Sequence, residues 1–565
     1  MAKNNKTSEI EKLKSEVKRL KKELKRKKKY GLVWEEKPEE VVEMCKEKLP
    51  VLKEVKNKEI ITDKDKPVNL LIEGDNYHAL SVLNYTHAKK VDVIYIDPPY
   101  NTGAKSWKYN NDYVDIEDAF RHSKWLSFID KRLRLAKNLL KDTGIICITI
   151  DENEQAQLKL LSDEIFGENN YLGTICIRNN PSGRTRKSEI SLQHEYAIFY
   201  SKNKNKKGIS TFYIPPEKKT HNYKKDDNGG WYEKRNLRRG RRKEEKPKRF
   251  FPIYVNPENL EISVKKKHGF IEVLPIDEFG HELTWDRDKE KIEDLYMKEE
   301  IWAEKTKKGY QIFFKFRPNL ELGETPKSLW IDPKYSSREY GISILKEIFG
   351  KSPFEYPKSL YAVMDCIMAM NSSKNILVLD FFAGSGTTGH AVLELNKEDG
   401  GNRQFILCTN NENNICTDVC YPRIEKVIKG YKNLKGEDVE GLGGNLKYFK
   451  TDFVDYHKPT DKNKINLTKQ ATEMLCVREG TFEKVINNER FKIFKNSNYY
   501  TGIIWDQTAI PAFKKAIKDV KGKFSVYVFS LGDETFDDEF RDIKQKVQLS
   551  PIPEAILRVY RRIFK

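Results

Sequence analysis

The stretch VDVIYIDPPY, residues 91–100, decides how the central part of this 565-residue chain folds. Its first six residues are mostly apolar and β-branched, a pattern that predicts a strand buried in a parallel sheet. Proline cannot donate to a sheet ladder, so the strand must end at Asp97. Because open α/β sheets bind ligands at the carboxyl ends of their strands, we expect a ligand site at Asp97, Pro98, Pro99 and Tyr100.

These four residues suit a planar base that carries an exocyclic amino group. The carboxylate of Asp97 and the carbonyl of Pro98 can each accept one hydrogen of such an amine. The ring of Tyr100 can stack on the base. We therefore predict that Asp97, Pro98, Pro99 and Tyr100 are the catalytic residues, in a reaction that uses neither a metal nor an activated thiol.

Strands and helices alternate on both sides of this stretch. Expected strands are followed by amphipathic helices such as 121–144, which predicts a doubly wound, Rossmann-like α/β sheet. The pattern breaks after residue 202 and returns at 356. The expected strands are 69–74, 91–96, 145–150, 174–179, 194–202, 375–380 and 403–409, and further helices are expected at 76–87 and 359–370.

A glycine-rich loop follows the strand in NILVLDFFAGSGTTGHAV, residues 375–392. Its glycines fit a dinucleotide-binding pattern, but the acid Asp380 ends the strand, and no site for hydride transfer accompanies it. A carboxylate there would repel a pyrophosphate and attract a cationic amino-acid head group. S-Adenosylmethionine has such a head group and no phosphate. We expect it to be the cofactor, bound by Asp380, Phe381, Phe382, Ala383, Gly384, Ser385, Gly386 and Thr387.

The segment TNNENN follows the next expected strand, 403–409. An acid at this place in a doubly wound fold binds the two ribose hydroxyls of an adenosine. Glu412, or Asn411 beside it, is therefore the expected ribose-binding residue.

The two motifs together resemble the amino-methyltransferases of DNA. Their order, with the catalytic motif before the cofactor loop and a variable insert between them, resembles the beta group, and most closely the modification (Mod) subunits of type III restriction systems. The resemblance covers residues of about 70–450. Its supporting stretches are LLIEGDNYHAL, ITIDENEQAQLKLLSDEIFGENN, QHEYAIFYSK, FEYPKSL and CTNNENNICTDVCYPRI.

This resemblance implies a fold, an activity and partners. The enzyme would methylate N6 of an adenine extruded from double-stranded DNA, since Asp97 stands where N4-cytosine enzymes more often have serine. A homodimer and a restriction subunit with helicase and nuclease activity are the implied partners. Asp75 would line the pocket of the cofactor adenine, and Lys358 would lie near its methionine end. Both have an alternative interpretation, as a plain turn and as a solvated lysine.

Other functions remain open at this point. The first alternative is N4-cytosine methylation on the same scaffold, and the second is a DNA-binding specificity subunit of a defence complex. RNA guanine-N2 methyltransferases use a similar tetrapeptide but usually place the glycine loop first. The intact acid, proline and glycine positions argue against an inactive chain.

The chain divides by composition into six expected parts. These are a basic coiled-coil-like helix at 1–30, a helical connector at 31–66, a catalytic half at 67–202, a target-recognition insert at 203–355, a cofactor-binding half at 356–439 and a small α/β domain at 440–565. The formal net charge of +19 fits a nucleic-acid partner. Within the insert, a solvated loop or a DNA-phosphate clamp is expected at Arg235, Arg238, Arg239, Arg241 and Arg242.

The remaining composition favours a cytoplasmic protein without membrane contact. No apolar run approaches the roughly 20 residues that span a bilayer, and the N-terminus lacks the apolar region of a signal peptide. Eight cysteines are present. Cys416 and Cys420 lie near Cys408, but no fourth ligand has matching spacing, so we expect buried thiols rather than a zinc site.

Overall fold

The computed structural model places the residues in two compact units, 1–210 with 326–565, and 211–325. The basic helix expected at 1–30 lies outside the part of the chain that the structure describes. The described residues are 34–63, 66–103, 108–110, 112–183, 190–211, 224–225, 230–317, 324–456, 460–497, 499–532 and 534–564.

A ten-stranded sheet forms the centre of the first unit. Five strands in its middle, β2, β20, β19, β3 and β6, are parallel to one another. β8 runs antiparallel between β6 and β7. In order across the sheet, the strands are β1 (Lys48–Glu54), β23 (Asn445–Asp455), β2 (Val68–Glu73), β20 (Gln404–Thr409), β19 (Leu377–Asp380), β3 (Val91–Ile96), β6 (Leu140–Ile150), β8 (Glu195–Ser201), β7 (Tyr171–Ile177) and β18 (Leu329–Trp330).

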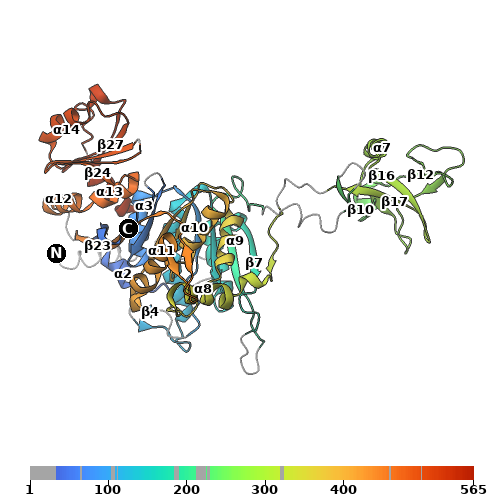
Figure 1. Ribbon diagram of the computed structural model, residues 1–565, viewed down its shortest axis with the longest axis horizontal. Helices are drawn as coiled ribbons and strands as arrows, with labels where there is room; N and C mark the ends of the chain where they lie inside the picture. The colour runs from blue at the N-terminus through green and yellow to red at the C-terminus, as the bar shows by residue number, and fades with distance from the viewer. Residues whose placement is uncertain are drawn as a thin grey trace, which may run out of the picture. The chain divides into compact units, whose positions relative to one another are not determined.

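Two sets of helices cover opposite faces of this sheet. Residues alternate between the faces of a strand: Ile406 and Cys408 of β20 share a core with helices α3, α4 and α5, whereas Phe405 and Leu407 face Gly389 of α10. The doubly wound fold predicted from the sequence is therefore confirmed (Figure 1). The first set is α3 (Asn76–Thr86), α4 (Arg121–Leu139) and α5 (Gln155–Phe166), and the second is α9 (Leu360–Met370), α10 (Thr387–Asp399) and α11 (Tyr421–Lys429).

Several expected boundaries differ from the structure. Among the described residues of the expected helical connector, the one α-helix is the short α2 (Glu40–Met44), and β1 then joins the sheet. The helix expected at 121–144 ends at Leu139, because β6 begins at Leu140. Residues 326–355 belong to the first unit rather than to the insert, and contribute β18 and the helix α8 (Ser343–Phe349).

The C-terminal region begins inside the main sheet, because β23 occupies the start of the expected domain at 440–565. Beyond it, Phe513 of helix α14 packs on Phe524 in a five-stranded sheet, as the α/β pattern predicted. Helices α13 and α15 contact α3 of the main sheet. The elements are α12 (Asp461–Gln470), α13 (Thr472–Glu479), β24 (Glu483–Asn487), β25 (Phe491–Asn496), β26 (Tyr499–Ile504), α14 (Ile510–Ile517), β27 (Lys523–Phe529), β28 (Val547–Ile552) and α15 (Glu554–Ile563).

The second unit is rich in β-structure and has its own apolar core. The buried indole of Trp285 donates to the carbonyl of Phe251, 2.7 Å away, in that core. No helix in the described ranges is both long enough and apolar enough to cross a membrane. The elements of the unit are β9 (Lys224–Lys225), β10 (Trp231–Asn236), β11 (Arg238–Arg242), β12 (Ile253–Val255), β13 (Ile262–Ser263), β14 (Ile271–Val273), β15 (Leu283–Trp285), α7 (Lys289–Met297), β16 (Ile301–Thr306) and β17 (Gly309–Phe316).

Candidate active site

An acidic residue stands at or just beyond the carboxyl end of each of the five parallel strands in the middle of the main sheet. Because these strands are parallel neighbours, their carboxyl ends share one edge, where doubly wound folds bind ligands. Two motifs far apart in sequence thus become adjacent, since Val93 of β3 pairs with Val378 of β19. In sheet order the acids are Asp75, Glu412, Asp380, Asp97 and Asp151.

Asp97 is held by groups from two other elements. The hydroxyl of Thr149, near the end of β6, donates to its Oδ1 atom over 2.8 Å. The ammonium of Lys358 lies 3.1 Å from the same oxygen. The turn behind it is fixed by the buried indole of Trp125, which donates to the carbonyl of Pro99 over 2.7 Å. These contacts pre-organise the carboxylate at the sheet edge.

Tyr100 belongs to a buried polar cluster around Glu195. Three donors converge on the Oε2 atom of Glu195: the Tyr100 hydroxyl at 3.1 Å, the Asn179 amide at 2.7 Å and the Lys358 ammonium at 2.5 Å. The same ammonium contacts the Tyr100 hydroxyl and lies 4.6 Å from the centre of its ring. Burial and the nearby carboxylates of Asp97 and Glu195 raise the pKa of Tyr100, so its hydroxyl remains protonated.

The tetrapeptide continues into a second buried cluster. Asn101 has a left-handed backbone with φ of 57°, and its amide donates to Oε1 of Glu154 over 2.5 Å. His122 contacts the same oxygen at 2.6 Å. Burial raises the pKa of Glu154 to about 8, partly offset by the hydrogen bond from Asn101 and by the charge of Arg121. This cluster fixes the chain immediately after Tyr100.

The glycine loop turns sharply between β19 and α10. Gly384 and Gly386 have φ angles of 51° and 80°, which side chains rarely adopt. A Cβ atom at Gly389 would lie 2.7 Å from Cδ1 of Ile424, so this glycine allows α10 to pack against α11. The loop therefore leaves backbone groups at the sheet edge without side chains in front of them.

Asp380 is buried at the base of this loop. Its Oδ1 accepts from the backbone N–H of Phe382 over 2.9 Å, and its Oδ2 accepts from the Thr388 hydroxyl over 2.5 Å. Burial raises the pKa of Asp380 to about 7 despite these two hydrogen bonds, and the charge of Asp97 adds to the rise. A cation bound at the loop would favour the ionised form of this carboxyl.

Arg423 of α11 supports the loop from behind. Its guanidinium is fully buried and donates to the Thr387 hydroxyl over 2.8 Å and to the Ser385 hydroxyl over 3.2 Å. Burial lowers the pKa of Arg423 to about 10, although Cys420 and Tyr431 act to raise it. Ser385 and Thr387 are thus fixed by a residue nearly 40 positions along the chain.

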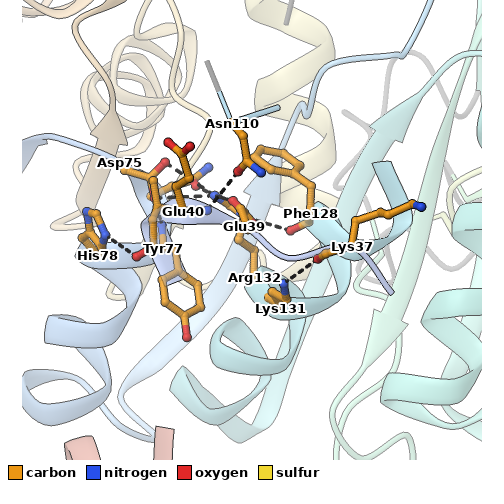
Figure 2. A network of polar contacts seen from close by, with 12 residues as sticks. Lys37, Glu39, Glu40, Asp75, Tyr77, His78, Asn110, Phe128, Lys131 and Arg132 are labelled. Atoms are coloured by element: carbon orange, nitrogen blue, oxygen red, sulfur yellow. Dashed lines mark hydrogen bonds and ion pairs between the residues drawn. The ribbon is translucent and has the colours of Figure 1, made fainter. Parts of the chain in front are cut away.

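Asp75 caps α3 and belongs to a network around a buried arginine (Figure 2). Its Oδ1 accepts from the backbone N–H of Tyr77 over 2.7 Å, and Arg132 of α4 lies 3.5 Å from its Oδ2. Glu39 binds the Arg132 guanidinium through both carboxylate oxygens, at 2.6 and 3.1 Å. Arg132 also donates to the side chain of Asn76, whose amide holds the carbonyl of Phe381 over 3.1 Å. The network therefore connects Asp75 to the glycine loop.

The two residues expected at the ribose differ in their surroundings. The side-chain oxygen of Asn411 accepts from the backbone N–H groups of Cys416 and Thr417, each over 3.0 Å. This oxygen caps the following helical segment. Glu412 is exposed at the same sheet edge, and it is the better candidate for binding two hydroxyls.

The arginines of the insert lie on strands rather than in a loop, so the expectation of a solvated loop is wrong for β10 and β11. Arg235 pairs with Glu233 at 2.6 Å, and Arg239 pairs with Asp286 at 2.9 Å. Arg238 donates to a backbone carbonyl. Arg241 and Arg242 are exposed and are the stronger candidates for contacting a polyanion.

Sequence reasoning missed the residues that position the candidate site. A polar residue inside an apolar strand, as in ITID, is a usable signal for Thr149. The pairing of Glu195 with Lys358 has no local signal, because the two residues are 163 positions apart. The missed residues are Glu39, Trp125, Arg132, Thr149, Asn179 and Arg423.

The edge of the sheet thus brings together the Asp97–Tyr100 tetrapeptide and the glycine loop that begins at Asp380, the two motifs by which the sequence resembles the amino-methyltransferases of DNA. The family model described as DNA methylase (N6_N4_Mtase) matches residues 91–419. The chain belongs to this family, as its motifs predicted.

Named relatives include Mod subunits of type III restriction-modification enzymes and a type II methyltransferase. The chain is 35% identical over 376 residues to the type III restriction-modification enzyme EcoPI Mod subunit of Escherichia phage P1, covering 61% of this chain and 58% of that subunit. It is 33% identical over 387 residues to the type II methyltransferase M.KpnI of Klebsiella pneumoniae, covering 68% of this chain and 88% of that enzyme. The StyLTI Mod subunit of Salmonella typhimurium is 31% identical and is covered over 56% of its length. The chain thus spans little more than half of these two Mod subunits.

Proposed function

We propose that this chain methylates N6 of adenine at a specific site in double-stranded DNA, with S-adenosylmethionine as methyl donor. The observation that carries the proposal is the alignment of β3 with β19, which brings the catalytic tetrapeptide beside the glycine loop. Membership of the DNA methylase family supports the same activity. The presence of Asp97 rather than serine favours adenine over cytosine.

The residues at the sheet edge fit S-adenosylmethionine. A buried carboxyl with a pKa of about 7, Asp380, would gain from a cationic neighbour. Gly384 and Gly386 leave the loop backbone open to a ligand. We assign the head group to residues 380–387, the ribose to Glu412 with Asn411 beside it, and the adenine pocket to Asp75. The resemblance implies that the methionine end lies near Lys358. When bound, the cofactor supplies an electrophilic methyl group.

Asp97 is the group that activates the target amine. The lone pair of an exocyclic amine is delocalised into the base, so the amine is a weak nucleophile. Hydrogen bonds from its two hydrogens to Asp97 and to the Pro98 carbonyl favour a tetrahedral nitrogen with its lone pair directed outward. The bond from nitrogen to the methyl carbon would form as the carbon–sulfur bond of the donor breaks, with its electron pair left on sulfur. The Asp97 carboxylate would stabilise the positive charge that develops on the nitrogen until that nitrogen releases one of its two protons.

Thr149 and Lys358 leave one oxygen of Asp97 for this task. Both bind Oδ1, so Oδ2 is the oxygen assigned to the substrate. An amine in duplex DNA is out of reach of this edge, so the base must be extruded. Tyr100 is assigned to stack on the extruded base.

Residues 211–325 are the proposed target-recognition domain. Their separate core supports a module that can change without disturbing the main sheet. Arg241 and Arg242 would contact phosphates directly, whereas Arg235, Arg238 and Arg239 would have to exchange partners within the module first.

The similarity to Mod subunits supports a role in a type III-like restriction-modification system. In that role the chain would act in the cytoplasm as a homodimer with a restriction subunit. The match to M.KpnI over 88% of its length favours a second candidate, an enzyme that modifies DNA without such a subunit. Purification from a host that expresses the neighbouring reading frame would separate the two.

The proposal is tested by replacing Asp97. We expect Asp97→Ala to lower kcat by at least about 10²–10³-fold, because the developing charge loses its partner, while S-adenosylmethionine binding measured by calorimetry stays near that of the wild type. Asp92→Ala is the matched control: Asp92 lies at the other end of the same strand, where it pairs with Lys141 at 2.8 Å.

The modified base is identified by single-molecule sequencing of DNA from cells that express the chain. N6-methyladenine at one sequence motif is the expected result. Detection of N4-methylcytosine instead would mean that the target base is cytosine. Full activity of Asp97→Ala would refute the catalytic role of Asp97.

A further inference from the structure

One buried ammonium joins three separate motifs of the sequence. Lys358 comes from FEYPKSL, Asp97 from the tetrapeptide and Glu195 from QHEYAIFYSK. The exposed fractions of the Lys358 and Glu195 side chains are 11% and 3%. The ammonium lies 3.1 Å from Asp97 and 2.5 Å from Glu195. A lysine in such a position is not a solvated surface residue.

The backbone around Lys358 fixes where its side chain begins. Ser359 caps α9, so the lysine lies just before a helix that packs on the sheet. A Cβ atom at Gly341 would lie 2.5 Å from the carbonyl oxygen of Pro357 and 3.0 Å from that of Lys358. The segment is therefore packed closely against its neighbour, and the lysine has little freedom to move away from the site.

Glu195 is fixed as firmly from the other side. It is the first residue of β8 and pairs with Ile177 of β7. Asn179, two residues beyond Ile177, donates to its Oε2 over 2.7 Å. Glu195 thus anchors the lysine to the sheet edge independently of Asp97.

The charges of the cluster suit the reaction. Two carboxylates and one ammonium give a net charge of −1 where the methylated nitrogen becomes positive. Without Glu195, the ammonium would cancel the charge of Asp97 and oppose the developing cation. Without Lys358, two carboxylates in a buried site would repel each other.

We propose that Lys358 is a positioning residue anchored by Glu195, which holds Oδ1 of Asp97 so that Oδ2 accepts from the target amine. This inference rests on the proposed methyl transfer and assigns Lys358 to the amine rather than to the cofactor. Glu195 supplies the charge that keeps the cluster at −1.

The cluster predicts how activity depends on pH. The groups that face Lys358 are Asp97, Tyr100, Glu195 and, at the end of β6, Asp151. Burial acts to lower the pKa of Lys358, but the carboxylates of Asp97 and Glu195 raise it above its ordinary value. Removing the charge of Glu195 lowers that pKa again. The lysine then becomes neutral at a lower pH and releases Asp97, so the alkaline limb of activity moves to lower pH.

The experiment measures kcat and KM between pH 6 and 10 for the full chain with duplex DNA that contains its methylation site. We expect the wild type to keep its kcat to the top of this range, because the pKa of Lys358 is raised above its ordinary value, and Glu195→Gln to lose kcat within the range. Lys358→Met should lower kcat by about 10²-fold through the misplaced carboxylate, with the KM for S-adenosylmethionine little changed. Lys358→Arg, which keeps the charge, should recover part of that loss.

Lys447 offers a matched control away from the site. It is a buried lysine between two carboxylates, Glu54 at the end of β1 and Glu59 five residues further along the chain. Glu54→Gln and Lys447→Met should keep the wild-type pH profile. If thermal melting shows that Lys358→Met is unfolded, the same measurements are made on Lys358→Arg and Asn179→Ala. A wild-type pH profile in both variants would overturn the inference.

The outcomes separate this inference from the proposed function. A wild-type chain that transfers no methyl group would overturn both. An active wild type with an unshifted Glu195→Gln profile would overturn only the positioning role. If Lys358→Met raises the KM for S-adenosylmethionine and retains kcat, Lys358 binds the cofactor and does not position Asp97.

Discussion

The side chain of Tyr100 has a ring and a hydroxyl that serve different partners. The hydroxyl donates to Glu195 and contacts Lys358. The ring carries the proposed stacking on the extruded base. Substitutions that keep one group and remove the other can therefore separate the two roles.

Tyr100→Ala should weaken binding of DNA with an extruded base by about 1–3 kcal/mol, the usual contribution of a stacked aromatic ring. Tyr100→Phe should retain most of that binding and show a smaller loss in kcat, because it removes only the contacts of the hydroxyl with Glu195 and Lys358. Fluorescence of 2-aminopurine at the target position measures extrusion. Equal losses in the two variants would mean that stacking is not the role of Tyr100.

The position of a single residue could be predicted where the sequence pattern shows the end of a strand. Asp97 and Asp380 both end an apolar run, so the sequence placed them at the sheet edge and suggested their chemistry. Their partners could not be predicted in the same way. Thr149, Lys358 and Glu195 meet Asp97 or each other only because strands distant in sequence become neighbours.

At the level of elements, the segment before the main sheet was the least predictable. The expected connector at 31–66 has a helix-like spacing of apolar residues, yet its helix contains only five residues. Pro50 lies within β1, and proline is compatible with a strand at the edge of a sheet, where one side of its backbone needs no partner. Tertiary pairing with β23 therefore overrides the local pattern.

This same segment contacts the side of the site that we propose binds the cofactor. The backbone N–H of Lys37 donates to Ser127 over 3.0 Å, and Glu39 makes the two hydrogen bonds to Arg132 that Figure 2 shows. Burial acts to lower the pKa of Arg132, but Asp75 and Glu39 raise it above its ordinary value. The arginine is thus charged in a fully buried position.

Glu39→Gln should lower the free energy of unfolding by about 3–5 kcal/mol, because it leaves a buried charge without its main partner. Urea titration followed by fluorescence measures the change. Glu43→Gln is the matched control on α2, since Glu43 pairs with Lys46 at 2.5 Å in an exposed position, and its loss should cost less than about 1 kcal/mol. Equal effects of the two substitutions would contradict a stabilising role for the buried pair.

At the level of the whole molecule, the structure divides the chain at other residues than the sequence suggested. The sequence predicted a break after residue 202 and a return at 356, whereas the compact unit is 211–325. Ser210 is still bound to the first unit, because its backbone N–H donates to the carbonyl of Ala369 over 2.8 Å. The segment after the insert adds β18 to the main sheet. Short strands that complete an existing sheet carry too little pattern to be recognised in sequence.

These boundaries define an exchange that tests target recognition. A chimera that receives the corresponding unit of a relative between Ser210 and Pro326 keeps the main sheet and the core of each unit intact. We expect its methylated motif to be that of the donor, since contacts to base edges would come from the exchanged unit while the catalytic edge remains. Single-molecule sequencing of host DNA reads the motif directly. An active chimera that still methylates the original motif would assign recognition to the first unit, and a second chimera that exchanges residues 483–564 would then test the C-terminal sheet.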